Sequence, residues 1–132
     1  MRVFIDTSAF YALLDRSDEN HLEAKQEWNR LLDEDRTLVT SNYILIETAA
    51  LSQNRLGMSA VRGFQENIFP ILNLEFITPK IHRLGMTALL ASSRRRLSLV
   101  DCVSFELMRE TGIRTAFAFD DHFREQGFNT VP

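Results

Sequence analysis

Acidic residues follow two apolar segments of the chain, each at the point where a strand is expected to end. Asp6 comes directly after Arg-Val-Phe-Ile at 2–5 and before two hydroxyl side chains, Thr7 and Ser8. Asp120 follows a second apolar run in the same way. In α/β proteins ligand sites lie beyond the carboxyl ends of parallel strands, so both carboxylates are placed to bind a metal ion or to take part in phosphate chemistry. The alternative for both is a helix N-cap, a position that selects Asp anyway.

Two further acids lie in helical segments with apolar neighbours. Glu47 stands between Tyr-Ile-Leu-Ile and Thr-Ala-Ala-Leu, where an isolated buried charge is costly. Its charge must therefore be compensated. The compensation is either a metal site shared with other acids, an ion pair with an arginine, or the positive end of the helix dipole. Asp101 follows Ser98 by three residues and fits a capping box, which is a structural alternative. Independent caps should not all fall at one edge of a sheet, so a shared function explains the four acids more economically.

The elements that must position these acids alternate along the chain. Strands are expected at 2–5, 37–40, 74–78, 115–119 and, as an edge strand, 128–131. Helices are expected at 9–14, 20–32, 41–55, 59–69, 80–92 and 98–110, with a turn or short helix at 120–125. This alternation favours right-handed crossovers and a sheet covered on both faces. We predict an α/β fold, a three-layer α/β/α sandwich with a mainly parallel sheet of about five strands, in a single domain over residues 1–132.

The composition is that of a soluble globular protein, with 45% hydrophobic and 25% charged residues. No apolar run reaches the roughly 18 residues that a membrane span needs, and the start of the chain lacks a signal-peptide pattern, so we expect a cytoplasmic protein without a membrane partner. A single cysteine, Cys102, excludes an internal disulfide and argues against a thiolate zinc site.

The net charge of −3 at first argues against a polyanionic partner. If the four acids bind a metal, however, 14 of the 18 Asp and Glu residues remain against 15 Lys and Arg. RNA is therefore not excluded as a substrate.

Nearly the whole chain resembles a PIN domain, in particular the VapC-type ribonuclease toxins of type II toxin–antitoxin pairs. The segments that carry the resemblance are Phe-Ile-Asp-Thr-Ser-Ala at 4–9, the helical Glu47, Leu-Ser-Leu-Val-Asp-Cys at 97–102 and Ala-Phe-Asp-Asp-His-Phe at 118–123. The family's four catalytic acids map onto Asp6, Glu47, Asp101 and Asp120. Its supporting hydroxyl maps onto Thr7 or Ser8, whereas Ala118 stands where many relatives have Thr or Ser.

An all-oxygen ligand set favours Mg²⁺ or Mn²⁺ over zinc, and the resemblance implies the same ions. We assign Asp6, Asp101 and Asp120 as the main ligands, with Glu47 completing the cluster or orienting a water for hydrolysis of an RNA phosphodiester. The basic run of Arg94, Arg95 and Arg96 precedes Asp101 and could hold substrate phosphates, although a solvated helix end is the alternative.

The resemblance also implies an antitoxin that docks in an apolar groove beside the acids, and a homodimer. One alternative is a PIN-domain RNA-processing nuclease without an antitoxin, and another is an inactive PIN module that only binds RNA or protein. A third is a haloacid-dehalogenase-like phosphatase, which expects Asp-x-Asp after the first strand, where this chain has Ser8 at the second position. Cleavage of RNA with Mg²⁺ or Mn²⁺, compared with Asp6→Asn, separates these functions.

Overall fold

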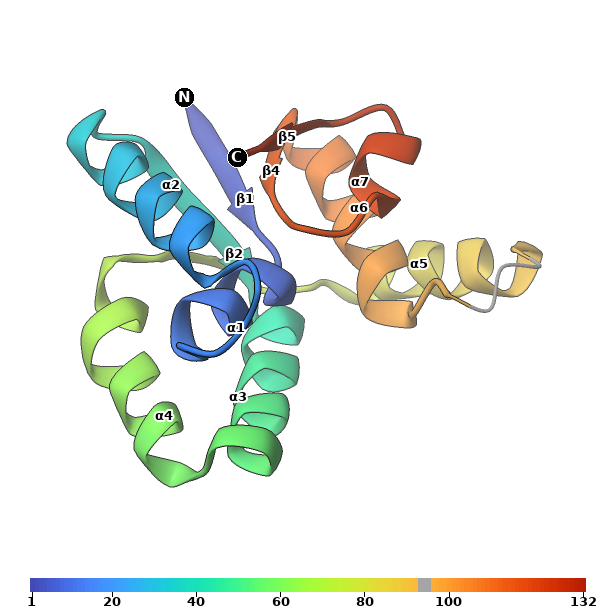
Figure 1. The fold of residues 1–132 in the computed structure, drawn as a ribbon. Coiled ribbons are helices and arrows are strands. Elements are labelled where there is room, and N and C mark those ends of the chain that lie inside the picture. Colours follow the sequence, from blue (N-terminus) through green and yellow to red (C-terminus); the bar gives the residue numbers. More distant parts are fainter. Residues whose placement is uncertain (93–95) are drawn as a thin grey trace.

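The centre of the molecule is a five-stranded, all-parallel sheet in the order β3-β2-β1-β4-β5 (Figure 1). The computed structural model describes residues 1–92 and 96–132. The strands are β1 (Arg2–Ile5), β2 (Thr37–Ser41), β3 (Asn73–Glu75), β4 (Thr115–Phe117) and β5 (Asn129–Val131). The predicted parallel sheet and the edge position of the last strand are confirmed. Because β1 lies between β2 and β4, the chain leaves the middle of the sheet at Asp6.

Helices cover both faces of this sheet, as the predicted three-layer sandwich requires. They are α1 (Thr7–Leu14), α2 (His21–Asp33), α3 (Asn42–Leu56), α4 (Met58–Gly63), α5 (Pro79–Ala91), α6 (Leu99–Thr111) and α7 (His122–Glu125). In Figure 1 the helices α1 to α4 gather on one side of the strands, and α5 to α7 on the other. Among the described helices none is long and apolar enough to cross a membrane.

Local capping sets the ends of the helices that carry the acids. The Ser41 side chain accepts a hydrogen bond from the backbone N–H of Ile44 at 3.1 Å, which starts α3. The helix ends at Gly57, whose φ of +94° is unfavourable for residues with a Cβ. Gly112, at φ +73°, ends α6 in the left-handed conformation. These boundaries agree with the prediction to within a residue or two.

Aromatic packing fixes α6 and α7 against the sheet. The fully buried Phe123 of α7 contacts Phe4 of β1 and Phe105 of α6, with ring centroids 6.2 Å and 5.0 Å apart. Burying such a side chain stabilises the fold by about 1.5–3 kcal/mol. The start of α6 and the loop before α7, which hold two of the candidate acids, are therefore supported by the core.

Three predicted elements differ from the structure. The expected helix at 59–69 is divided into α4, a π-helical turn at Phe64–Ile68 and a 3₁₀ turn at Phe69–Ile71, in a region where Phe64 packs edge-on against Phe10 of α1. The strand expected at 74–78 ends at Glu75, and Thr78 instead caps α5.

The strand expected at 115–119 ends at Phe117, because the backbone N–H of Phe119 turns to the Ser8 hydroxyl. In the helix expected at 20–32, Ala24, Trp28, Leu31 and Leu32 recur at helical spacing and predict one buried face. That prediction is wrong at Leu32. Leu32 is 43% exposed, whereas Glu27 is buried together with Ala24 and Leu31.

Candidate active site

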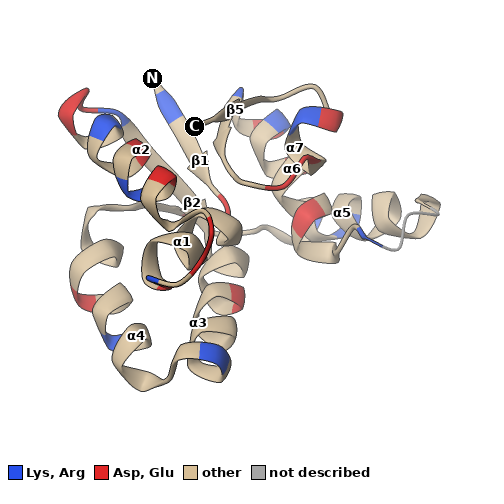
Figure 2. Ribbon diagram, viewed as in Figure 1, with Lys and Arg blue, Asp and Glu red and all other residues tan. Residues whose placement is uncertain are grey.

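The four predicted acids lie on separate elements around the carboxyl edge of the sheet. Asp6 is the N-cap of α1, Glu47 lies in α3, Asp101 is the third residue of α6, and Asp120 lies in the loop between β4 and α7. Since β1 and β4 are parallel neighbours, Asp6 and Asp120 reach the same edge. Figure 2 shows acidic segments at the end of β1, on α3 and at the start of α6. Electrostatic repulsion connects all four, as the pKa shifts below show.

Asp6 is the most buried of these acids, at 4% exposure. Its Oδ2 accepts hydrogen bonds from the backbone N–H of Ser8 at 3.1 Å and from the Ser8 hydroxyl at 2.7 Å. Both bonds favour the carboxylate, yet burial, followed by the charge of Asp120 and to a smaller degree that of Asp101, raises the pKa of Asp6 to about 7. Asp6 is therefore held firmly in place while its negative charge is poorly compensated.

Glu47 and Asp120 experience the same kind of environment. Burial raises the pKa of Glu47, and the charges of Asp101 and Asp120 raise it further. The side chain of Thr7 acts against this shift. Burial and the nearby Asp101 also raise the pKa of Asp120, against a 3.0 Å hydrogen bond from the backbone N–H of His122. Three acids of the group are thus destabilised in their charged forms.

Asp101 completes a capping box. Its carboxylate accepts from the Ser98 backbone N–H at 3.0 Å, and the Ser98 hydroxyl accepts from the Asp101 backbone N–H at 3.1 Å. The structural role weighed from the sequence is therefore confirmed. The same carboxylate raises the pKa values of Asp6, Glu47 and Asp120, so a cap and a position in the acidic group are compatible.

Among the described residues no Lys, Arg or His forms an ion pair with this group, and only the nearby His122 acts against the raised pKa of Asp120 by its charge. Clustered, partly buried carboxylates without a counter-charge either bind protons or bind a cation. Their oxygen donors and uncompensated charge fit a divalent cation such as Mg²⁺ or Mn²⁺.

The carboxylates would have to turn to converge on one ion. Within residues 1–92 and 96–132 no three Asp, Glu, His or Cys side chains already stand close enough together to hold a metal. The reason is visible in their bonds, since Asp6, Asp101 and Asp120 each accept from a nearby backbone N–H. Mutual repulsion also favours separate orientations while no cation is bound.

Both predicted supporting hydroxyls contact the acids. Ser8 donates to Asp6 and accepts from the backbone N–H of Phe119 at 3.0 Å, so one hydroxyl joins the ends of β1 and β4. Thr7 is buried, and its side chain acts on Glu47 by opposing the raised pKa of that carboxyl. Ala118, which has no hydroxyl, is buried one residue before Phe119. Ser8 therefore supplies a link between these strand ends from the β1 side.

Of the predicted basic run, Arg94 and Arg95 lie outside the described residues. Arg96 is exposed in a turn before α6.

An apolar hollow of about 370 Å³ opens beside the acids and is lined by Tyr43, Ile46, Glu47 and Val100. Ile46 is 67% exposed there. The Tyr43 hydroxyl lies 2.6 Å from Nδ1 of His82. The resemblance to the family predicts an apolar groove without naming its residues, although Tyr43 and Glu47 are one helical turn apart in the sequence.

Comparison with known proteins places this arrangement in a family. The PIN domain family model matches residues 3–129. The chain is 33% identical over 130 residues to the 23S rRNA-specific endonuclease VapC20 of two Mycobacterium tuberculosis strains, covering 98% of this chain and 97% of that protein. This chain therefore belongs to the PIN domain family.

Solved structures agree with that assignment. The crystal structure of Mycobacterium tuberculosis VapC20, described as a sarcin-ricin loop cleaving toxin, superimposes with a TM-score of 0.83 at 32% identity, covering 96% of this chain and 95% of that one. PAE2754 from Pyrobaculum aerophilum gives a TM-score of 0.66 at 14% identity, covering 99% of this chain and 90% of that one, and so shows the shared fold alone.

Proposed function

We propose that this PIN domain is a metal-dependent endoribonuclease that acts as the toxin of a type II toxin–antitoxin pair. The observation that carries the proposal is the group of four acids, from four separate elements, that has no positive partner among the described residues. Identity over nearly the full length to an rRNA-specific endonuclease supports RNA as the substrate class.

Asp6, Asp101 and Asp120 would hold Mg²⁺ or Mn²⁺, with Glu47 completing the ligand set or orienting the attacking water. When bound, such an ion supplies a more acidic water and neutralises charge on the phosphate. Ser8 keeps the Asp6 carboxylate in one orientation through two hydrogen bonds. A Glu47 carboxylate oxygen would accept a proton from the attacking water. At the same time the water oxygen would bond to phosphorus, and the P–O bond to the leaving nucleotide would break.

RNA would enter beside the start of α6. The exposed Arg96, together with Arg94 and Arg95 before it in the sequence, would bind phosphates near Asp101. The relative named for 23S rRNA and for cleavage of the sarcin-ricin loop makes that RNA the first substrate to test.

The hollow lined by Tyr43, Ile46 and Val100 would receive an apolar side chain of the antitoxin. Glu47 lines the same hollow, so an occupant would cover that acid. Large apolar side chains also remain exposed elsewhere, including Phe76 and Leu90 at 69% and 78%, which is compatible with a homodimer.

The test is incubation of purified protein with ribosomes and with total RNA in Mg²⁺ or Mn²⁺, followed by sequencing of the new RNA ends. We expect discrete cuts that disappear with chelator and in Asp6→Asn. Cleavage that persists with chelator, or full activity of Asp6→Asn, would contradict the proposal. Growth arrest on expression, relieved by co-expression of an upstream small protein, tests the toxin role separately.

A further inference from the structure

Thr40 of β2 and Thr48 of α3 are fully buried, and neither belongs to the motifs that identify the acids. A hydroxyl in the protein interior is unfavourable unless it makes a hydrogen bond, whereas Val fills nearly the same volume without that requirement. The destination of each hydroxyl bond therefore indicates what the threonine does.

Both hydroxyls bind the chain on either side of Asp6. Thr40 Oγ1 donates to the carbonyl oxygen of Ile5 at 2.9 Å, and Thr48 Oγ1 donates to the hydroxyl of Thr7 at 3.3 Å. They approach from β2 and α3, whereas Ser8 joins the same turn to the end of β4. The turn that presents Asp6 is thus held from both of its flanks.

Thr48 also connects two of the acids. Thr7, which accepts from Thr48, also acts against the raised pKa of Glu47, the residue immediately before Thr48. Thr7 of α1, the residue after Asp6, is therefore joined to Thr48 of α3, the residue after Glu47. A displacement of either segment would change the separation of the Asp6 and Glu47 carboxylates.

The hydroxyls of Ser104 and Thr111, which are also buried or half-buried, make bonds of a different kind. Ser104 donates to the carbonyl of Val100 and Thr111 to that of Leu107, each at 2.7 Å and each within α6. Such bonds serve one helix only. Those of Thr40 and Thr48 cross 35 and 41 residues of chain and end beside Asp6.

We propose that Thr40 and Thr48 are positioning residues that hold the Asp6 turn and Glu47 at the spacing needed to share one divalent cation. The proposal rests on the proposed function, because the cation is the one assigned there. Neither threonine touches RNA or the ion, and both act through Ile5 and Thr7.

Thr40→Val and Thr48→Val each remove one hydroxyl at nearly constant volume. Thr48→Ser keeps the hydroxyl at position 48 and removes only the methyl group. Thr111→Val is the matched control, because it makes the same chemical change at the far end of α6. Binding of Mn²⁺ to each full-length variant is measured by electron paramagnetic resonance without RNA. We expect binding about 10- to 100-fold weaker for the two Val variants, the range typical of residues that support metal ligands, and wild-type binding for Thr111→Val.

Cleavage kinetics give a second measurement, for which we expect a lower kcat with an unchanged KM in both Val variants and recovery in Thr48→Ser. Circular dichroism and the melting temperature establish that each variant is folded. If Thr48→Val does not fold, Thr40→Val and Thr48→Ser carry the test.

Folded Val variants that bind Mn²⁺ as tightly as wild type would overturn the positioning role, as would an equal loss of binding in Thr111→Val. Wild-type protein that binds Mn²⁺ but cuts no RNA would overturn the proposed function alone. Wild-type protein that binds no Mn²⁺ would overturn both.

Discussion

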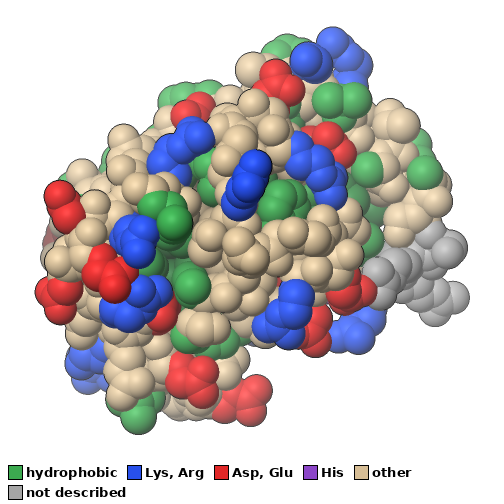
Figure 3. All heavy atoms as spheres, turned by 90° about the horizontal axis from the view of Figure 1, so that it is seen from above, with side chains coloured by type: hydrophobic (Ala, Val, Ile, Leu, Met, Phe, Trp, Pro, Cys, Tyr) green, Lys and Arg blue, Asp and Glu red, His purple; other side chains and the backbone are tan. Residues whose placement is uncertain are grey.

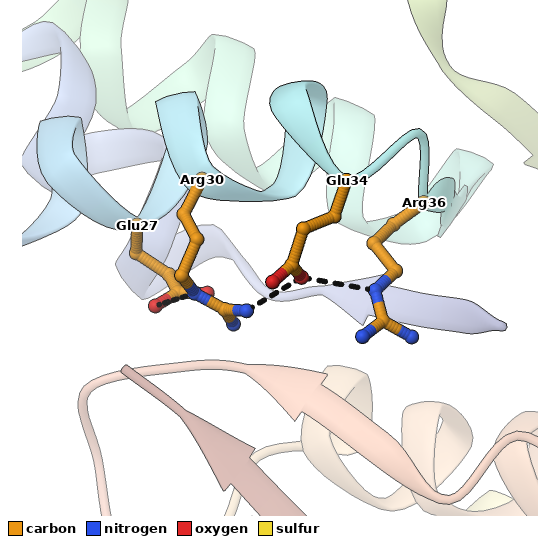
Figure 4. A network of polar contacts seen from close by, with 4 residues as sticks. All are labelled: Glu27, Arg30, Glu34 and Arg36. Carbon is orange, nitrogen blue, oxygen red and sulfur yellow. Dashed lines mark hydrogen bonds and ion pairs between the residues drawn. The ribbon is translucent and has the colours of Figure 1, made fainter.

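Two regions of the molecule carry acidic side chains in opposite electrostatic settings. Along α2 and the turn after it, Glu27 and Glu34 both pair with Arg30, and Glu34 also pairs with Arg36 (Figure 4). At the carboxyl edge of the sheet, the four acids of the candidate site have no such partner within the described residues. Glu27 is nearly as buried as Asp6, so burial alone does not distinguish the two regions.

The pKa shifts express the difference. Hydrogen bonding from Arg36, followed by the attraction of Arg30, lowers the pKa of Glu34, whereas burial and neighbouring acids raise that of Asp6 to about 7. The end of the molecule seen in Figure 3 likewise shows Asp and Glu interspersed with Lys and Arg. Along α2 the acids are balanced by arginines of the same chain, whereas at the carboxyl edge no ion pair balances the four acids within the described residues. This difference in ion pairing, rather than the presence of acids, distinguishes the candidate site.

The largest effect is expected from Asp6→Asn. The substitution keeps the size of the side chain but removes the carboxylate assigned to the ion, so RNA cleavage should fall by more than about 100-fold, beyond the usual loss for a supporting residue. Without added metal its melting temperature should be equal to or above that of wild type, because a poorly compensated buried charge is gone. If Asp6→Asn still cleaved RNA at the wild-type rate, the uncompensated acids at the carboxyl edge would have no more functional importance than the paired acids of α2.

The next effect is a dependence of stability on pH in metal-free protein. The pKa of Asp6 is about 7 in the folded state against an ordinary value of 3.8, so the folded protein binds this proton more tightly than the unfolded chain does. The contribution of Asp6 to the free energy of unfolding is therefore fully present below about pH 4 and is lost as the pH rises to about 7. One pKa unit corresponds to about 1.4 kcal/mol, so the loss amounts to a few kcal/mol. Glu47 and Asp120 shift in the same direction.

Denaturant titrations from pH 4 to 8 measure this loss, with Asp6→Asn as the control in which the slope should flatten. Mn²⁺ at pH 7.5 should restore stability, because it binds the folded state. A wild-type stability that rises with pH through this range would show that the acids are compensated after all.

Arg30→Met tests the opposite region. Met preserves much of the apolar stem of Arg30 but leaves the buried Glu27 carboxylate without its partner. We expect the melting temperature to fall by about 3–8 °C while cleavage per folded molecule stays unchanged. Arg36→Met, which leaves Glu34 paired with Arg30, should have a smaller effect in the same thermal scan.

Features decided by neighbouring residues were predictable from the sequence. The helices expected at 41–55 and 98–110 begin after Ser41 and Ser98 and end within a residue of the expected bounds, because caps depend on groups three or four residues away. Asp6 and Asp120 could be placed together because parallel strands bring their carboxyl ends to one edge.

Features that depend on distant contacts were not predictable in the same way. The helix expected at 59–69 changes geometry where Phe64 packs on Phe10, a contact that no local pattern reveals. Apolar periodicity selected Leu32 on α2 and passed over Glu27, which is buried because Arg30 accompanies it. The hydrogen-bond partners of Thr40 and Thr48 could not be predicted, because these bonds reach across 35 and 41 residues.

The smallest effect is expected at Asp121, which follows Asp120 directly and makes the comparison within one dipeptide. Its side chain is 75% exposed and pairs with Arg124 at 3.1 Å, whereas Asp120 is half-buried and unpaired in the described structure. Asp121→Asn should leave the free energy of unfolding within about 0.5 kcal/mol of wild type, the usual range for surface positions. Cleavage should change by less than about threefold, since removing one exposed charge only slightly reduces the repulsion on Asp120. Asp120→Asn, assayed in parallel, should be inactive. Equal losses of cleavage activity in both variants would mean that proximity to the edge of the sheet, rather than the absence of an ion-pair partner, defines the site.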